Sequence, residues 1–96
     1  EAERAHLAAL GERLRDGLAR LEIRDGGSTT QIVPAIIGGE EDALRLSALL
    51  EERGMVAAAI RPPTVPPGTS RLRIALRASH SESDVDALLA ALEEAR

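Results

Sequence analysis

Apolar residues recur at helical spacing in three segments of the chain. Leucines recur every three or four positions over residues 2–21, which predicts an amphipathic helix. Residues 40–53 begin with three acidic side chains and end before Gly54, an arrangement typical of helix termini. The third segment begins with Ser81 and Asp84 in a pattern that resembles a capping box. Its apolar residues follow at positions i, i+3, i+4 and i+7, namely Val85, Leu88, Leu89 and Leu92. The pattern therefore predicts three helices.

Three shorter segments read as strands. Residues 31–37 are mostly apolar, and Pro34 within them indicates an edge strand or a bulge. Residues 55–60 are small and apolar. Residues 71–77 alternate, so that leucine and isoleucine face one side while the arginines and Ala75 face the other. The predicted fold is α+β in the order α-β-α-β-β-α, with a three-stranded, mostly antiparallel sheet and helices on one face.

A proline-rich loop connects the last two predicted strands. Four prolines in the six positions 62–67 stiffen it, because proline locks its own φ and restricts the preceding residue. Arg73 follows in the next strand, on the side opposite Leu72 and Ile74, so it is expected to point away from the core. A planar guanidinium beside a stiff loop suits bidentate binding of a carboxylate. The pattern alone leaves open that Arg73 is a solvated strand arginine or part of a salt bridge.

Composition narrows the classes of partner. The 96 residues include no Phe, Trp, Tyr or Cys, so a single domain must build its core from Leu, Ile, Val and Ala. The net charge of −4 and the lack of stacking aromatics argue against nucleic acid and anionic membranes. No apolar run approaches the roughly 20 residues of a membrane helix. The absence of cysteine fits a cytoplasmic location.

The sequence gives only weak support to a phosphate, metal or triad site. Gly38-Gly39 lacks the spacing of a phosphate loop. The acidic residues at 40–42 and 51–52 are interpreted as solvated helix faces, because no histidine lies at ligand spacing. His6 and His80 are interpreted as a surface histidine and a helix-entry histidine, and neither belongs to a triad. No metal site is expected.

The stretch AIRPPTVPPGTSRLRIALRASHSESDVDALLAAL resembles the C-terminal segment of the α-oxoamine synthases, fold-type I pyridoxal-phosphate enzymes. The likeness continues upstream through STTQIVPAIIGGEEDALRLSALLEERG and, more loosely, RAHLAALGERLRDGLARL. It implies that residues 1–96 form a single C-terminal domain, with residues 1–21 as a linking helix and residues 31–96 as a βαββα core. It also implies that Arg73 holds the carboxylate of an amino-acid substrate.

The resemblance assigns further roles. Thr64 and Pro63, with Pro62 and Val65, would line the substrate entrance, although a purely structural loop stays open as an alternative. Arg61 would meet the acyl or coenzyme A portion of a second substrate. The alternation of the strand, rather than the resemblance, places Arg71 and Arg77 on the face of Arg73, where they either raise the local positive potential or, as we interpret them, are solvated charges. The RPPTVP loop favours the biotin branch, in which L-alanine and a pimeloyl thioester (of coenzyme A or a carrier protein) condense with loss of CO2. The implied whole enzyme is a homodimer.

All twelve residues counted as Lys+Arg are arginine. Pyridoxal phosphate is held as a Schiff base on a lysine, so no cofactor-binding or catalytic residue is expected in this chain. We expect a C-terminal piece of a larger enzyme, without its large cofactor domain and inactive alone. Two alternatives stay open: a sister α-oxoamine synthase that uses glycine, and a free-standing α/β module that binds a small ligand or a partner chain.

Overall fold

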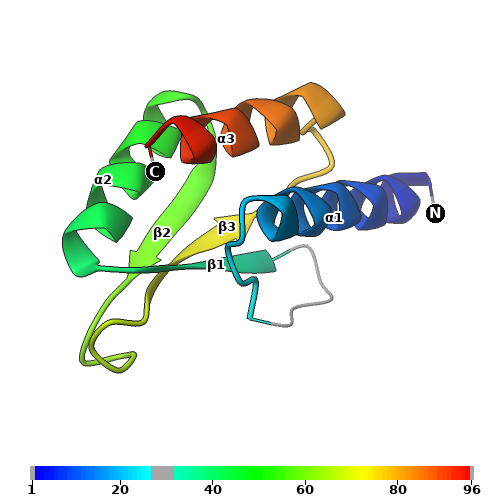
Figure 1. Cartoon of the computed structure of the whole chain (residues 1–96). Coiled ribbons are helices and arrows are strands. Elements are labelled where there is room, and N and C mark those ends of the chain that lie inside the picture. The colour runs from blue at the N-terminus through cyan, green and yellow to red at the C-terminus, as the bar shows by residue number, and fades with distance from the viewer. Residues whose placement is uncertain (1, 27–31, 96) are drawn as a thin grey trace.

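The computed structural model describes residues 2–26 and 32–95. Its elements are α1 (Ala2–Arg20), β1 (Ile32–Gly38), α2 (Glu40–Glu52), β2 (Val56–Ile60), β3 (Ser70–Ala75) and α3 (Glu82–Ala95), drawn in Figure 1. This order confirms the predicted α-β-α-β-β-α arrangement, with boundaries shifted by one or two residues. Gln31 and most of the turn predicted at residues 25–30 lie outside the described residues.

The strand order is β1-β3-β2, and both pairs are antiparallel. The prediction for Pro34 is confirmed, because β1 lies at the sheet edge and its register with β3 shifts between Ile36 and Gly38. The last strand in sequence, β3, occupies the centre of the sheet. Arg73 on β3 consequently has Pro34 on one side and Ala58 on the other.

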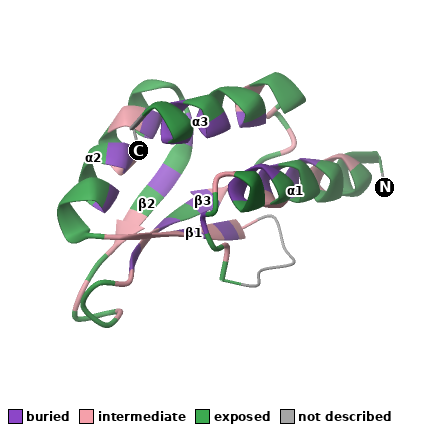
Figure 2. Cartoon of the chain, viewed as in Figure 1, coloured by how far each residue is buried: buried purple, intermediate pink, exposed green. Residues whose placement is uncertain are grey.

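All three helices lie on one face of the sheet (Figure 1), as predicted. Figure 2 shows the buried residues where the helices and the sheet face one another. Leu72 and Ile74 of β3 are fully buried there. The leucine stripe of α1 packs into the same core, and its central members Leu10, Leu14 and Leu18 are completely inaccessible to solvent. The core is therefore aliphatic, as the composition requires.

Helices α1 and α3 lie side by side over the sheet. A Cβ at Gly17 would overlap the Leu89 side chain, whereas one at Gly11 would meet only the flexible end of Arg15, at 3.3 Å. Close packing therefore requires a glycine at Gly17 and not at Gly11. Arg13 adds a two-pronged ion pair, with Nε and Nη2 donating to the Asp86 carboxylate at 2.8 and 2.9 Å.

The helix ends follow the sequence signals. Before α3, the Asp84 N–H donates to Ser81 Oγ at 3.2 Å, and the Ser81 N–H donates to Asp84 Oδ2 at 2.8 Å, which confirms the capping box. After α2, Gly54 adopts φ 83° and the Met55 N–H donates to the Leu50 carbonyl at 2.9 Å. This left-handed ending turns the chain directly into β2.

Candidate functional site

Arg73 lies on the face of the sheet that the helices leave uncovered. Its neighbours in β3, Leu72 and Ile74, are fully buried, whereas Arg73 itself is exposed. Within residues 2–26 and 32–95 it forms no hydrogen bond or ion pair. Its guanidinium donors therefore remain available to a ligand, which agrees with the outward orientation predicted from the alternation.

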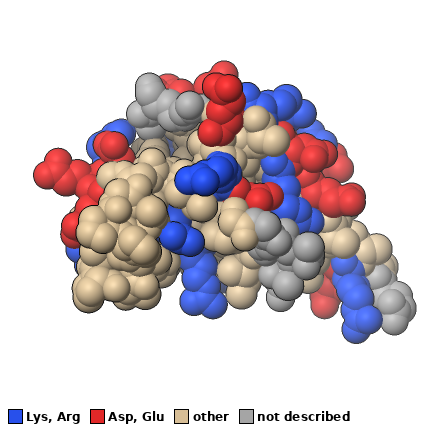
Figure 3. All heavy atoms as spheres, turned by 60° about the horizontal axis from the view of Figure 1, so that its bottom comes forward, with Lys and Arg blue, Asp and Glu red and all other residues tan. Residues whose placement is uncertain are grey.

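The surroundings of Arg73 on this open face are apolar. With Arg71 it stands among the outward-facing residues of the three strands: Ile32, Pro34, Ile36, Val56, Ala58, Ile60 and Ala75. None of these strand residues carries a carboxylate, although the whole chain has a net charge of −4. Figure 3 turns the lower side of Figure 1 forward and shows basic atoms beside uncharged surface, with acidic atoms also nearby. Such a face favours an anion whose remaining groups are apolar.

The proline-rich loop joins β2 to β3 and extends beyond the sheet (Figure 1). At its start, Arg61 Nη1 donates to Glu40 Oε2 at 3.0 Å, and the Arg61 carbonyl accepts a hydrogen bond from the Thr64 N–H at 3.1 Å. At its end, the Thr69 N–H and Oγ1 both donate to the Pro66 carbonyl, at 3.1 and 2.6 Å. Short-range hydrogen bonds thus hold both ends of a loop that the prolines already stiffen.

The four candidate substrate-binding residues come from adjoining elements. Arg61, Pro63 and Thr64 are exposed in the loop, and Arg73 is exposed on the strand that the loop enters. The structure brings the first three together in one turn and places Arg73 on the neighbouring sheet face. These residues form an exposed surface of this chain rather than a closed pocket.

Arg71 and Arg77, predicted to be solvated charges on the face of Arg73, each match that prediction only in part: Arg71 in its face, and Arg77 in its exposure. Arg71 lies on that face but is partly buried, and its Nε donates to the Thr69 carbonyl at 3.1 Å. Arg77 is not on the strand, because β3 ends at Ala75. Its backbone N–H donates to His80 Nδ1 at 2.9 Å, in the turn that leads to α3.

The acidic and histidine side chains also have partners that the sequence did not indicate. Glu40 and Asp42, predicted to be solvated, form ion pairs with Arg61 and with Arg45, the latter at 3.3 Å. His6, predicted to be a surface residue, is partly buried, and its Nε2 lies 2.6 Å from the His80 carbonyl. A carbonyl only accepts, so this nitrogen carries the proton and donates. The partners of Glu40 and His6 come from distant positions, which explains why local patterns missed them. The Asp42–Arg45 pair, in contrast, joins residues three positions apart in α2.

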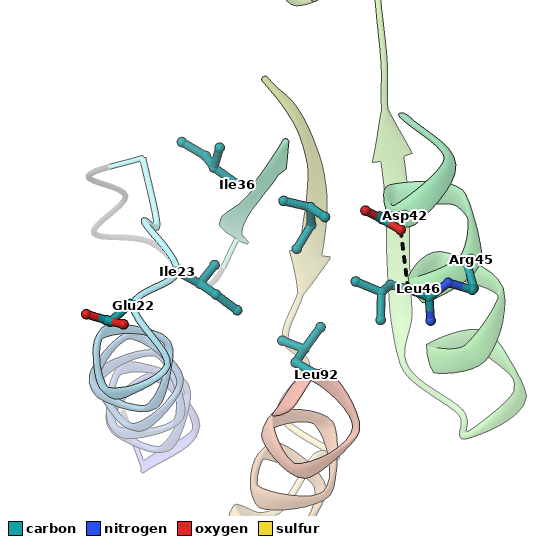
Figure 4. Close-up of a pocket in the computed structure, with 8 residues that line it drawn as sticks. Glu22, Ile23, Ile36, Asp42, Arg45, Leu46 and Leu92 are labelled. Carbon is teal, nitrogen blue, oxygen red and sulfur yellow. Dashed lines mark hydrogen bonds and ion pairs between the residues drawn. The ribbon is translucent and has the colours of Figure 1, made fainter. Parts of the chain in front are cut away.

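A cavity of about 380 Å³ lies away from the candidate residues, where the end of α1 approaches β1, α2 and α3 (Figure 4). Ile23, Leu46 and Leu92 contribute apolar walls, and the Asp42–Arg45 pair stands beside Leu46. Sequence patterns did not indicate this cavity, because its walls come from four separate elements.

Two pKa values are shifted at the contact between α1 and α3. The hydrogen bond from Arg13 and its positive charge lower the pKa of Asp86, and the Asp86 carboxylate raises the pKa of Arg13 in return. Among the described residues, no three His, Asp or Glu side chains converge on a point where a metal ion would fit. Nor is any helix in the described segments long and apolar enough to cross a membrane.

Comparison with known proteins defines the class. Residues 1–92 match the family model "Aminotransferase class I and II", and the chain belongs to this family. The fold is that of the small domain of fold-type I aminotransferase-like enzymes. A serine palmitoyltransferase structure from Sphingomonas wittichii superposes with a TM-score of 0.82 at 33% identity, over 97% of this chain and 24% of that one.

Particular relatives carry a more specific name. The chain is 55% identical, over 99% of its length, to the 8-amino-7-oxononanoate synthase of Gluconacetobacter diazotrophicus. A structure described as SPT with its PLP internal aldimine superposes with a TM-score of 0.82 at 26% identity, over 97% of this chain and 24% of that chain. The chain spans about a quarter of the length of the relatives it matches.

The residues of this chain do not fit covalent attachment of pyridoxal phosphate. The internal aldimine requires a lysine amine, and the 96 residues include none, since all twelve basic side chains are arginine. What the chain does provide is Arg73, an arginine without a protein partner in the described part of the structure, whose guanidinium is suited to binding an anion.

Proposed function

We propose that this chain is the small, C-terminal domain of an 8-amino-7-oxononanoate synthase, in which Arg73 holds the carboxylate of L-alanine. The observation that carries the proposal is the exposed guanidinium of Arg73 on the central strand, which has no partner among residues 2–26 and 32–95. The 55% identity to an enzyme of this name supports the choice of branch. The stiff RPPTVP loop beside the strand is the second element of the site.

Arg73 contributes binding and orientation. Two parallel N–H donors on a planar group hold both oxygens of a carboxylate, and each charge-assisted hydrogen bond contributes about 1.5–3 kcal/mol. Because β3 is paired on both sides and rests on buried Leu72 and Ile74, its backbone is a rigid base for this side chain. A carboxylate fixed in this way sets which bond of the amino acid is aligned for cleavage.

The loop residues serve the second substrate. Thr64 and Pro63 line the entrance for a pimeloyl thioester, of coenzyme A or of a carrier protein, and Arg61 meets a polar part of that molecule. The condensation joins the acyl group to the alanine α-carbon, breaks the thioester bond and releases CO2. Pyridoxal phosphate, when bound, takes up the electron pair freed at the α-carbon.

The remainder of the enzyme must supply the lysine, because this chain has none. In this proposal the chain packs on a large cofactor domain of the same protein, residues 1–21 form the linking helix, residues 31–96 form the βαββα core, and the whole enzyme is a cytoplasmic homodimer. The isolated chain is inactive. Mixing it with pyridoxal phosphate should leave the cofactor spectrum unchanged, and a stoichiometric Schiff-base absorbance band would contradict the proposal.

Product analysis of the whole protein tests which branch of the α-oxoamine synthases it belongs to. The protein is given pimeloyl-CoA with L-alanine, glycine or L-serine in separate reactions, and free thiol and CO2 are measured. The proposal predicts turnover with L-alanine at least tenfold faster than with the other two amino acids. Preference for glycine or for L-serine would move the protein to a sister branch, and the absence of thioester consumption would favour a binding module.

A further inference from the structure

The proline-rich loop is attached to the domain by two different contacts. Its start is held from outside the loop by the ion pair between Arg61 and Glu40, the first residue of α2. Its end is held by Arg71, whose Nε donates to the Thr69 carbonyl. The Glu40 contact joins residues 21 positions apart, so it connects the loop entrance to a helix that packs on the sheet.

We propose that Glu40 is a positioning residue that orients Arg61 at the entrance for the acyl thioester. This inference rests on the proposed function and deepens it. Arg61 then binds an anionic group of the thioester, a carboxylate or a phosphate, with the N–H groups that Glu40 does not use. Nothing in the sequence pattern singled out Glu40, which reads as one of three acidic residues at a helix start.

The geometry of the pair supports this role. A guanidinium has five N–H donors, and the described contact to Glu40 engages Nη1 at 3.0 Å. The Arg61 and Glu40 side chains are 45% and 49% exposed, so a ligand has access to the remaining donors. A long arginine side chain samples many rotamers in solution, and fixing it on ligand binding costs conformational entropy. The contact to Glu40 already restricts Arg61, so less entropy is lost when the ligand binds.

Glu41 provides a matched control. It is the next residue of α2, is equally acidic and exposed, and also stands at the helix N-terminus, where a negative charge is favourable. It has no ion pair among the described residues. A difference between Glu40→Ala and Glu41→Ala therefore reports the contact to Arg61 rather than net charge or the helix terminus.

Kinetics of the whole protein test whether Glu40 acts through Arg61. Glu40→Ala should raise KM for the acyl thioester about two- to fivefold, the range expected for an exposed ion pair, with kcat and KM for alanine unchanged. Glu41→Ala should equal the wild type. Adding Glu40→Ala to Arg61→Ala should have no further effect, since the residue to be positioned is gone. Equal effects of the two glutamate variants, or additive effects with Arg61→Ala, would overturn the inference.

Two thioesters identify the anionic group. If Arg61 binds a phosphate of coenzyme A, the Glu40→Ala effect should disappear with pimeloyl-pantetheine, which lacks the nucleotide phosphates. If it binds the distal carboxylate of the acyl chain, the effect should persist with pimeloyl-pantetheine and disappear with the methyl ester of that carboxylate in pimeloyl-CoA. Persistence with both substrates would exclude both anions and contradict the proposed contact.

Amide chemical shifts of the 96-residue chain separate failure of this inference from failure of the proposed function. The Thr64 N–H donates to the Arg61 carbonyl, whereas Thr69 is held at the other end of the loop. Glu40→Ala should shift the Thr64 amide resonance and leave that of Thr69 in place, and Glu41→Ala should move neither. An unmoved Thr64 resonance would refute the positioning role even if the whole protein makes the proposed product.

Discussion

The two faces of the sheet carry different side chains although the same three strands build both. On the covered face, Leu72 and Ile74 are fully buried under the helices. On the open face, Arg71 and Arg73 alternate with them along the same strand. The two faces differ because a strand turns successive side chains in opposite directions. The covered face supplies the stability, and we propose that the open face binds the substrate. A substitution of Leu72 should therefore change the stability of the fold, whereas one of Arg73, the next residue of β3, should change substrate binding.

The largest expected effect is on stability at the covered face. Leu72→Ala removes a fully buried side chain and should lower the free energy of unfolding by about 2–5 kcal/mol. Arg73→Ala, one residue away and exposed, should change it by less than about 0.5 kcal/mol. Urea denaturation of the 96-residue chain measures both. Equal losses would show that the open face is also part of the structural core.

The second largest expected effect is a change in stability caused by substitutions in the helices above the covered face. Gly17→Ala should destabilise the chain by about 1–3 kcal/mol, because the added methyl group would overlap Leu89. Gly11→Ala should instead stabilise it by up to about 1 kcal/mol, since alanine favours the helix and only the flexible end of Arg15 must move. Thermal unfolding of the two variants checks this, and the same sign for both would contradict the packing described here.

A smaller effect should appear as a pH dependence between α1 and α3. Arg13 lowers the pKa of Asp86 in the folded chain, so this carboxylate stabilises the fold above its unfolded pKa of about 4. The contribution is lost as pH falls through the lower, folded value. The melting temperature of Asp86→Asn should therefore approach that of the wild type as pH falls below about 4. A constant difference across this range would rule out the titration of Asp86 as its cause.

Periodicity predicted the element order, the covered face and the outward direction of Arg73, because each depends on the spacing of neighbours along the chain. The capping box of Ser81 and Asp84 was equally local and was confirmed. The strand order was not fixed by any local pattern: β3 inserts between β1 and β2 only in three dimensions. The same holds for the partners of Arg61, Arg13 and His6, which lie 21 to 74 positions away.

The glycines of α1 also show that local sequence does not determine contacts between distant elements. Both Gly11 and Gly17 lie inside α1, where glycine is less favourable than alanine. Only Gly17 faces a neighbouring helix closely enough to need the missing side chain. Two identical local signals thus have different causes, and the difference depends on where Leu89 lies.

The role of Arg73 is tested most directly by measuring amino-acid kinetics and thermal stability together in the whole protein. Arg73→Ala should raise KM for alanine by at least about tenfold, because it removes both charge-assisted hydrogen bonds and the loss of one alone would have about this effect. The melting temperature should be unchanged. Arg77→Ala, an exposed arginine beyond the end of β3, should match the wild type in both. A large drop in melting temperature with unchanged alanine kinetics in Arg73→Ala would contradict a substrate-binding role and make Arg73 a structural residue.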